Sequence, residues 1–190
     1  MSRAYRIRVR ESVNRVVRAS DHVSTQLEVL GILPQDQMAE LLAQELVRRG
    51  FERKANVLSR VEDGVTISVD VATGTVTVRA ETETEIELEG LRQGHGDSDW
   101  TVAQKAMAEE NLRKEVKQEL DKQFEKRKQT LQEQATNRLE GVLGDVRREL
   151  DEAVNRVTAE ALKQRAAQIG QIKELTEDPA TGSLTIVVEV

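Results

Sequence analysis

The chain has 190 residues, 33% of them charged and only 2% aromatic, with a formal net charge of −6 and no cysteine. The lack of cysteine excludes a disulfide framework and thiolate chemistry, and the scarcity of aromatic residues argues against binding of nucleic acid by base stacking. No apolar stretch approaches the roughly 20 residues needed to cross a bilayer, and the N-terminus lacks a signal core. We therefore expect a cytoplasmic protein that does not enter a membrane.

The first 92 residues predict an α+β domain with a mainly antiparallel sheet. Tyr5, Ile7 and Val9 alternate with three arginines, which indicates a half-buried strand with a basic outer row. Extended stretches follow at 13–18 and 23–30, with a turn predicted at 19–22. A helix is predicted to begin at Pro34 and to end at Gly50, with one apolar face that covers the sheet.

A strand meander follows this helix. Residues 57–61 and 65–71 flank Asp63-Gly64, a strong hairpin signal, and a second turn is predicted around Gly74. Beyond it, five glutamates alternate from Glu81 to Glu89 on another strand or on an extension of the previous one. Like charges in one row repel each other. We therefore predict that the row of Arg6, Arg8 and Arg10 lies beside them.

Residues 93–100 predict a loop that holds the only close group of ligand-type side chains. His95, Asp97 and Asp99 are weak candidates for a divalent metal site, because a histidine and two carboxylates suit such an ion. Gly and Asp are also ordinary loop residues, and Asp99 is placed to cap the next helix. We expect no metal, no cofactor and no catalytic residue, with a small metal-dependent enzyme as the rival interpretation.

Residues 101–168 predict one long helix, because they contain no proline and are rich in strong helix formers. A continuous helix of this length would extend roughly 100 Å. Its apolar residues recur at steps of roughly 3.8 residues, so a coiled-coil-like arm is expected to pack straight or with a right-handed twist. Gly141 and Gly144 are the only weak points at which it could fold back.

The apolar stripe of this helix needs a covering partner, since exposed Leu and Val along a whole face is costly. A second copy, another protein and the chain itself all remain open as that partner. A basic cluster on the same helix, Lys122, Lys126, Arg127 and Lys128, is interpreted as a solvated face. The stripe is the stronger signal, and its predicted interaction residues are Leu112, Val116, Leu120, Phe124, Leu131, Leu139, Val142, Val146, Leu150, Val154 and Val157.

Residues 169–190 predict a C-terminal β-hairpin whose turn lies at 177–182. Its last strand is rich in Ile and Val, and an isolated two-stranded hairpin is marginal in water. The hairpin is therefore expected to dock, on the sheet of its own chain if the helix folds back, or on a second copy if the helix is straight. This argument favours a homo-oligomer.

Two parts of the chain resemble a known family. Residues Arg10 to Leu30 (RESVNRVVRASDHVSTQLEVL), with Ala153 to Glu160 (AVNRVTAE) and Gly170 to Asp178 (GQIKELTED), resemble the bacterial FtsH ternary system domains. These accompany an FtsH-like AAA+ protein, a MoxR-type AAA+ ATPase and a von Willebrand A protein. The resemblance implies an accessory component of an ATPase-dependent, conflict-type system, and its motifs transfer no site residues.

The sequence therefore predicts four parts: an α+β sheet domain at 1–92, a loop at 93–100, a helical arm at 101–168 and a hairpin at 169–190. The function that fits best is a non-enzymatic scaffold or adaptor that binds proteins through the long helix and the sheet, with AAA+ ATPases and a von Willebrand A protein as partners. The alternatives are the metal-dependent enzyme and a nucleic-acid-binding accessory protein. The acidic balance of the chain argues against nucleic acid.

Overall fold

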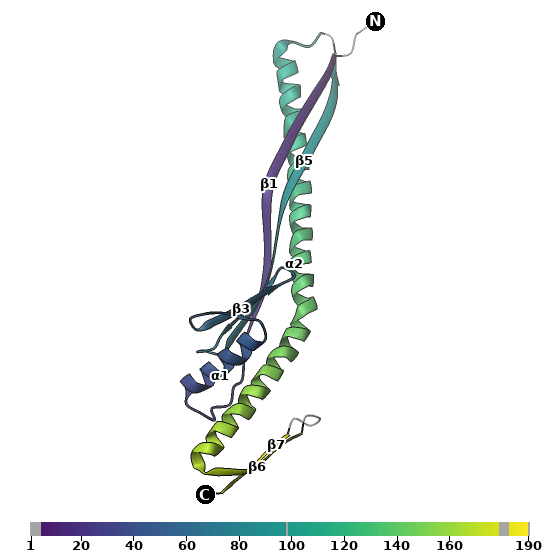
Figure 1. The fold of residues 1–190 in the computed structure, drawn as a ribbon. Helices are drawn as coiled ribbons and strands as arrows, with labels where there is room; N and C mark the ends of the chain where they lie inside the picture. The colour runs from purple at the N-terminus through teal and green to yellow at the C-terminus, as the bar shows by residue number, and fades with distance from the viewer. Residues whose placement is uncertain (1–4, 98, 179–182, 190) are drawn as a thin grey trace. The chain divides into compact units, whose positions relative to one another are not determined.

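A computed structural model describes residues 5–97, 99–178 and 183–189 and shows an α+β fold, as predicted (Figure 1). Its elements are β1 (Tyr5–Gln26), α1 (Gln35–Arg48), β2 (Glu52–Lys54), β3 (Val57–Glu62), β4 (Val65–Asp70), β5 (Thr75–Gly96), α2 (Val102–Ile169), β6 (Gln171–Asp178) and β7 (Ser183–Glu189). In the described part of the chain, no helix is long and apolar enough to cross a membrane.

The main sheet has five strands in the order β1-β5-β4-β3-β2. The predicted turn at Asp63-Gly64 joins β3 to β4, with Glu62 paired to Val65. Both turn residues have positive φ, 50° and 76°, which is the conformation that a two-residue hairpin turn requires. The turn before β5 depends on Gly74, which has a φ of 73°. The Gly74 amide donates a hydrogen bond to the Asp70 carbonyl at 2.8 Å.

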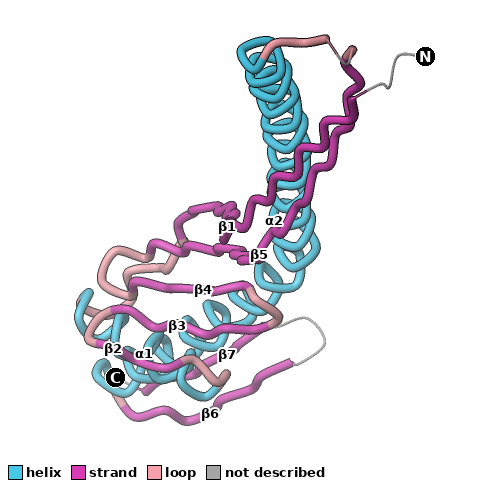
Figure 2. Tube along the Cα trace, turned by 90° about the horizontal axis from the view of Figure 1, so that it is seen from above, coloured by secondary structure: helices cyan, strands magenta, loops and turns pink. Residues whose placement is uncertain are grey.

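Helix α1 forms where the sequence predicts it. The Pro34 carbonyl accepts the amides of Gln37 and Met38, so the proline stands at the start of the helix, where its missing N–H costs nothing. At the other end Gly50 has a φ of 88°, and the Phe51 amide returns to the Leu46 carbonyl at 3.1 Å. The helix packs against β2 and β3 (Figure 2).

The chain forms two compact units, each with its own core. The first unit comprises residues 1–20 and 81–135, and the second comprises residues 21–80 and 136–190. The strands β1 and β5 and the helix α2 each contribute one part to each unit. The core of the first unit contains Ile7, Val9, Val17, Ala19, Ile86, Leu88, Val116, Leu120 and Leu131. That of the second unit includes Leu42, Leu46, Leu58, Val65, Val69, Val76, Leu139, Val146, Leu150 and Val157.

Helix α2 is continuous, so the chain does not fold back at Gly141 or Gly144. Its first turn is closed by Thr101 and Gln104. The Gln104 amide donates to the Thr101 hydroxyl at 3.3 Å, and the Thr101 amide donates to the Gln104 side-chain oxygen at 2.8 Å. This reciprocal pair is a capping box, so Thr101 rather than Asp99 caps the helix.

Two element boundaries differ from the sequence prediction. The turn expected at 19–22 is absent, because β1 runs unbroken from Tyr5 to Gln26. The strand β5 continues to Gly96, so the loop predicted at 93–100 begins later. The compact units also divide the chain differently from the predicted boundaries at 92 and 100, because long strands and a long helix pair residues that are far apart in sequence.

The hairpin β6–β7 forms a sheet of its own and does not join the five-stranded sheet. Its strands pair antiparallel from Gln171 with Glu189 to Asp178 with Ser183, with a register shift between Ile172 and Glu174. Of the turn predicted at 177–182, Glu177 and Asp178 instead belong to β6, and residues 179–182 lie outside the described residues. Lys163 of α2 contacts Glu177 of β6 at 3.4 Å and links helix to hairpin.

Candidate protein interfaces

The apolar stripe of α2 is covered by the chain itself. Val116, Leu120 and Leu131 are buried in the core of the first unit, and Leu112 and Phe124 pack against it. The guanidinium of Arg15 on β1 lies 5.1 Å from the centre of the Phe124 ring. The second unit covers the rest of the stripe: Leu139, Val146, Leu150 and Val157 are buried, Val142 packs against its core, and Val154 is half-buried.

This burial argues against the stripe as an interaction surface, which stays a prediction. Val116 and Leu120 are each 1% exposed and Leu139 is 2% exposed, so these three side chains offer almost no surface to a partner protein. In the first unit, Val116 and Leu120 share their core with residues of β1 and β5, among them Ile86 and Leu88. The sequence left open whether a second copy, another protein or the chain itself covers the stripe, and in the structure the chain itself covers it.

The acidic row of β5 lies beside β1, but of the predicted Arg6, Arg8 and Arg10 it is Arg10 that pairs with the row, and the other partners are Asn14 and Arg18. Within the first unit Arg10 donates to Glu89 at 2.8 Å and Arg18 donates to Glu83 at 3.0 Å. Asn14 donates to Glu85 at 2.8 Å. All these side chains are exposed, so each pair contributes little stability and mainly neutralises the row. The acidic row is therefore largely matched by the chain and is a weak candidate for a docking surface.

The structure does not bring the predicted metal candidates together. His95 belongs to β5, while Asp97 and Asp99 follow the strand, and all three side chains are exposed. Among the residues that the structure describes, no group of three or more His, Asp or Glu side chains is placed to hold a metal ion. Nothing in their geometry supports the metal-dependent enzyme, which stays a prediction.

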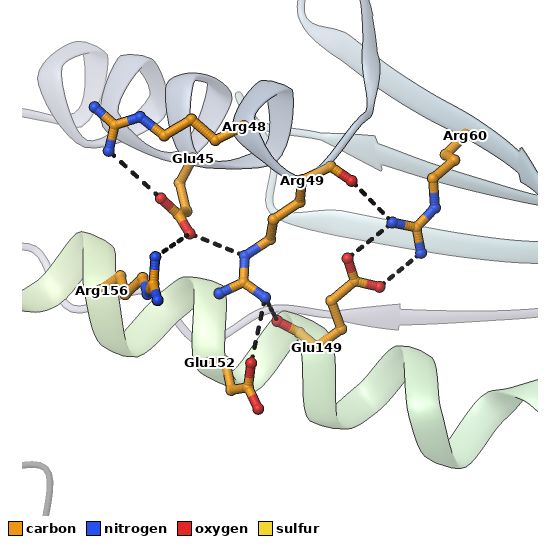
Figure 3. A network of polar contacts seen from close by, with 7 residues as sticks. All are labelled: Glu45, Arg48, Arg49, Arg60, Glu149, Glu152 and Arg156. Atoms are coloured by element: carbon orange, nitrogen blue, oxygen red, sulfur yellow. Dashed lines mark hydrogen bonds and ion pairs between the residues drawn. The ribbon is translucent and has the colours of Figure 1, made fainter. Parts of the chain in front are cut away.

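A polar network in the second unit connects α1, β3 and α2 (Figure 3). Glu45 of α1 is only 5% exposed and accepts a hydrogen bond from Arg49 Nε at 2.9 Å. Arg156 of α2 approaches the same carboxylate at 3.8 Å. Arg60 of β3 donates two hydrogen bonds to Glu149 of α2, at 2.6 and 2.9 Å. This paired geometry satisfies both carboxylate oxygens of Glu149.

The electrostatics of the network identify it as a structural clamp. The hydrogen bonds that Arg60 donates to Glu149 raise the pKa of Arg60 against the opposing effect of burial. Burial lowers the pKa of Arg49, but its hydrogen bonds with Glu45 and Glu152 outweigh this and raise the pKa overall. Arg60 also lies 4.8 Å from the centre of the Phe51 ring. Each acid has an arginine partner, so none is poised for acid–base chemistry.

A shallow hollow on the first unit gathers positive charge. It is lined by Arg18 of β1 and by Lys122, Lys126 and Lys128 of α2, and we call it the basic hollow. Its volume is about 710 Å³, and Asp121 and Glu125 also line it. Arg18 pairs with Glu83, whereas the three lysines are exposed and form no ion pair within the described part of the chain. In an acidic protein, this is a local surplus of positive charge.

The hairpin carries a second uncovered feature. The registers Ile172–Val188 and Leu175–Ile186 place these residues on one face, and Leu184 continues it opposite Glu177. We call Ile172, Leu175, Leu184, Ile186 and Val188 the apolar row. Leu175 is 42% exposed, the other four are half-buried, and none belongs to either core.

Sequence reasoning noticed both features but ranked them below the stripe of α2. The lysine cluster is visible in the sequence, yet whether such cations are neutralised depends on neighbours that only the fold supplies. The apolar row was predicted as a strand in need of cover. The clamp of Figure 3 was missed, because its residues come from three elements and have no common spacing in the sequence.

Comparison with known proteins identifies the family of the chain. The family model for FtsH ternary system domain X5 matches residues 1–190, the whole chain. No curated protein and no solved structure matches the chain significantly. Because the family model covers every residue, the chain belongs to the FtsH ternary system domain X5 family.

Proposed function

We propose that the chain is a non-enzymatic adaptor of an FtsH-containing system, and that it binds an acidic face of a protein partner through the basic hollow. The family match supports the accessory role. The AAA+ ATPases and the von Willebrand A protein that accompany such domains are the proposed partners.

The observation that carries the proposal is the set of unneutralised lysines in the basic hollow. Lys122, Lys126 and Lys128 stand on one exposed part of α2, while the carboxylates of the neighbouring β5 row pair with β1 instead. Clustered cations of this kind attract an acidic partner and accelerate its encounter, and salt weakens both effects. The long helix thus contributes to binding through its polar face, because its apolar face is buried.

The test is co-purification of the chain with each AAA+ ATPase and with the von Willebrand A protein from the same genome. We expect the double variant Lys122→Glu/Lys126→Glu to weaken capture at least about tenfold, and capture by the wild type to fall as salt rises. The matched control is Lys114→Glu/Lys117→Glu, which changes the same charge on the same helix outside the hollow. Equal capture by both double variants would overturn the proposed surface.

The same experiment separates the adaptor from the enzyme. The variants His95→Ala, Asp97→Ala and Asp99→Ala are expected to fold and to capture the partner as the wild type does. Stoichiometric divalent metal in the purified protein that is lost in these variants would instead favour the enzyme. Capture of DNA or RNA in place of protein by the basic hollow would favour the nucleic-acid accessory.

A further inference from the structure

The second unit contains an open groove between the edge strand β1 and helix α2. Its volume is about 670 Å³, and it is lined on the strand side by Val23, Thr25 and Leu27. On the helix side it is lined by Leu143, Leu150 and Val154. Val76 and Val78 of β5 form the floor and are almost fully buried, whereas Val23 at the rim is 41% exposed. The helix therefore covers β5 but leaves the adjoining side of β1 open.

The edge of β1 beside this groove can accept another strand. β1 is the terminal strand of the sheet order, and β5 is its neighbour. The Leu27 amide donates to the Gly74 carbonyl at 2.8 Å, so Leu27 faces β5. Successive residues of a strand direct their N–H groups to opposite sides, so Gln26 presents its backbone groups to the free edge. A groove between an edge strand and a helix is the arrangement by which proteins bind extended segments as added strands.

This edge also lacks the protection that free edges normally carry. Charged residues and proline on an edge strand block unwanted pairing. Arginines and acids occupy β1 as far as Asp21, but none of these residue types occurs from His22 to Leu27. The strand β7 shares this property: it has a free edge, and Glu189 is its only charged residue. Two unguarded edges thus occur in the same chain. One lies beside a groove that is lined by apolar residues together with Glu28, Arg147 and Asp151, and the other lies beside the apolar row.

The hairpin cannot fill the groove of its own chain. The groove residues Leu143 to Val154 precede the end of α2 by roughly 22 to 39 Å along the helix axis. Each hairpin strand has at most eight residues, which span only about 27 Å, so its tip would reach just the near end. In the structure Glu177, which is near that tip, contacts Lys163. Lys163 lies between the groove and the end of α2, so the hairpin of the same chain stops short of the groove.

We propose that β7 of a second copy enters this groove and pairs with β1, so that two copies exchange hairpins. The inserted strand would place Leu184, Ile186 and Val188 beside Val23 and Thr25 of β1, on the side of the sheet that faces α2. It would also satisfy the free backbone groups around Gln26. The inference does not depend on the adaptor role, because it uses the free edges of the second unit and not the basic hollow of the first.

The test is the molar mass of the full chain in solution, measured by light scattering over a dilution series. The wild type is expected at twice the mass of one chain. Gln26→Pro removes the outward N–H and is tolerated at an edge position, so it should yield a folded monomer, whereas Gln26→Ala should remain a dimer. Ile186→Lys in the apolar row should also yield a monomer, while Thr185→Lys on the opposite face should not.

A mixture of the two monomeric variants sharpens the test. A pair formed from Gln26→Pro and Ile186→Lys retains one intact groove and one intact β7, so the mixture should recover a dimer that dissociates at least about tenfold more readily than the wild type. Circular dichroism checks that each variant keeps its helix. If Gln26→Pro fails to fold, the oligomeric state of Ile186→Lys alone tests the proposal. A wild-type monomer at every concentration, or a dimer unchanged by both variants, would overturn the proposal. The variants of the basic hollow should remain dimeric, so this result is independent of partner capture.

Discussion

The five-stranded sheet and the hairpin β6–β7 bury apolar residues to very different degrees. In the sheet, Leu58 and Val69 are 0% exposed, because α1 and α2 contribute residues to the same core. In the hairpin, Leu175 is 42% and Val187 is 43% exposed. Both regions have strand-forming sequences, so strand propensity alone does not determine which of them acquires a core.

The difference shows what a sheet needs to be stable. Two paired strands bury little surface between them, and a second layer must cover the apolar face of the sheet that they form. The main sheet has that layer, and the clamp of Glu45, Arg49, Arg60 and Glu149 holds it in place. The hairpin is linked to α2 through Lys163 and Glu177, and its described residues belong to neither core. The second unit therefore contains one covered core and one hairpin whose apolar row is not covered.

The largest contrast is expected from truncating a side chain in each region. Leu46→Ala removes a fully buried side chain from the core and should lower the free energy of unfolding by about 3 kcal/mol. Ile186→Ala removes a half-buried side chain and should lower it by less than about 1 kcal/mol in the monomer. Urea unfolding of each variant, under conditions in which it is a monomer, measures both losses of free energy. Equal losses would contradict the distinction between covered core and uncovered hairpin.

Breaking the clamp should have the next largest effect. Glu149→Ala leaves the guanidinium of Arg60 partly buried without its carboxylate, which should cost about 2 kcal/mol. The matched control is Glu89→Ala, which breaks an exposed pair with Arg10 in the first unit and should change stability by less than about 0.5 kcal/mol. Thermal unfolding compares the two. A loss no larger than that of the control would show that the pair of Arg60 and Glu149 contributes nothing to the packing of α2 on β3.

Two glycine substitutions should act in opposite directions. A Cβ added at Gly141 meets no atom within 4 Å, so Gly141→Ala should stabilise α2 by about 0.5–1 kcal/mol. At Gly170 a Cβ would collide with the Glu189 carbonyl oxygen, so Gly170→Ala should displace β7 from α2. Amide hydrogen exchange measures both effects, as slower exchange around residue 141 and faster exchange in the hairpin. Unchanged protection of β6 and β7 in Gly170→Ala would show that the close approach is unnecessary.

The smallest effect concerns pH. The hydrogen bond from Arg53, aided by one from Gln44, lowers the pKa of Glu40 below its ordinary value of 4.5. A depressed pKa stabilises the fold above the ordinary value, and this stabilisation disappears as pH falls through the pKa of the folded state. Glu40→Gln should therefore be slightly less stable than the wild type at neutral pH and equally stable well below pH 4.5. Urea unfolding at both pH values tests this, and a constant difference would contradict it.

The sequence by itself determined the elements whose signals are local. Period-two alternation identified parts of β1, β3, β4 and β5, the Asp63-Gly64 turn set the β3–β4 hairpin, and Pro34 and Gly50 bounded α1. The composition of 101–168 predicted a long helix but left open whether it folds back at its two glycines, and in the structure it is unbroken. The Arg and Glu rows predicted that β1 lies beside β5, since their alternating charges leave few other ways to avoid repulsion.

Only the tertiary structure decided what covers each apolar face. The stripe of α2 looked like an interaction surface, but a stripe has the same spacing whether it meets a partner or its own sheet. Strand pairing between residues far apart in sequence brought β1 and β5 to α2 and buried it. The same pairing gave Glu83 and Glu89 of β5 arginine partners, while Lys122, Lys126 and Lys128 form no ion pair in the part of the chain that the structure describes. The candidate interfaces therefore depend on which residues the fold has already covered, and long-range contacts decide that.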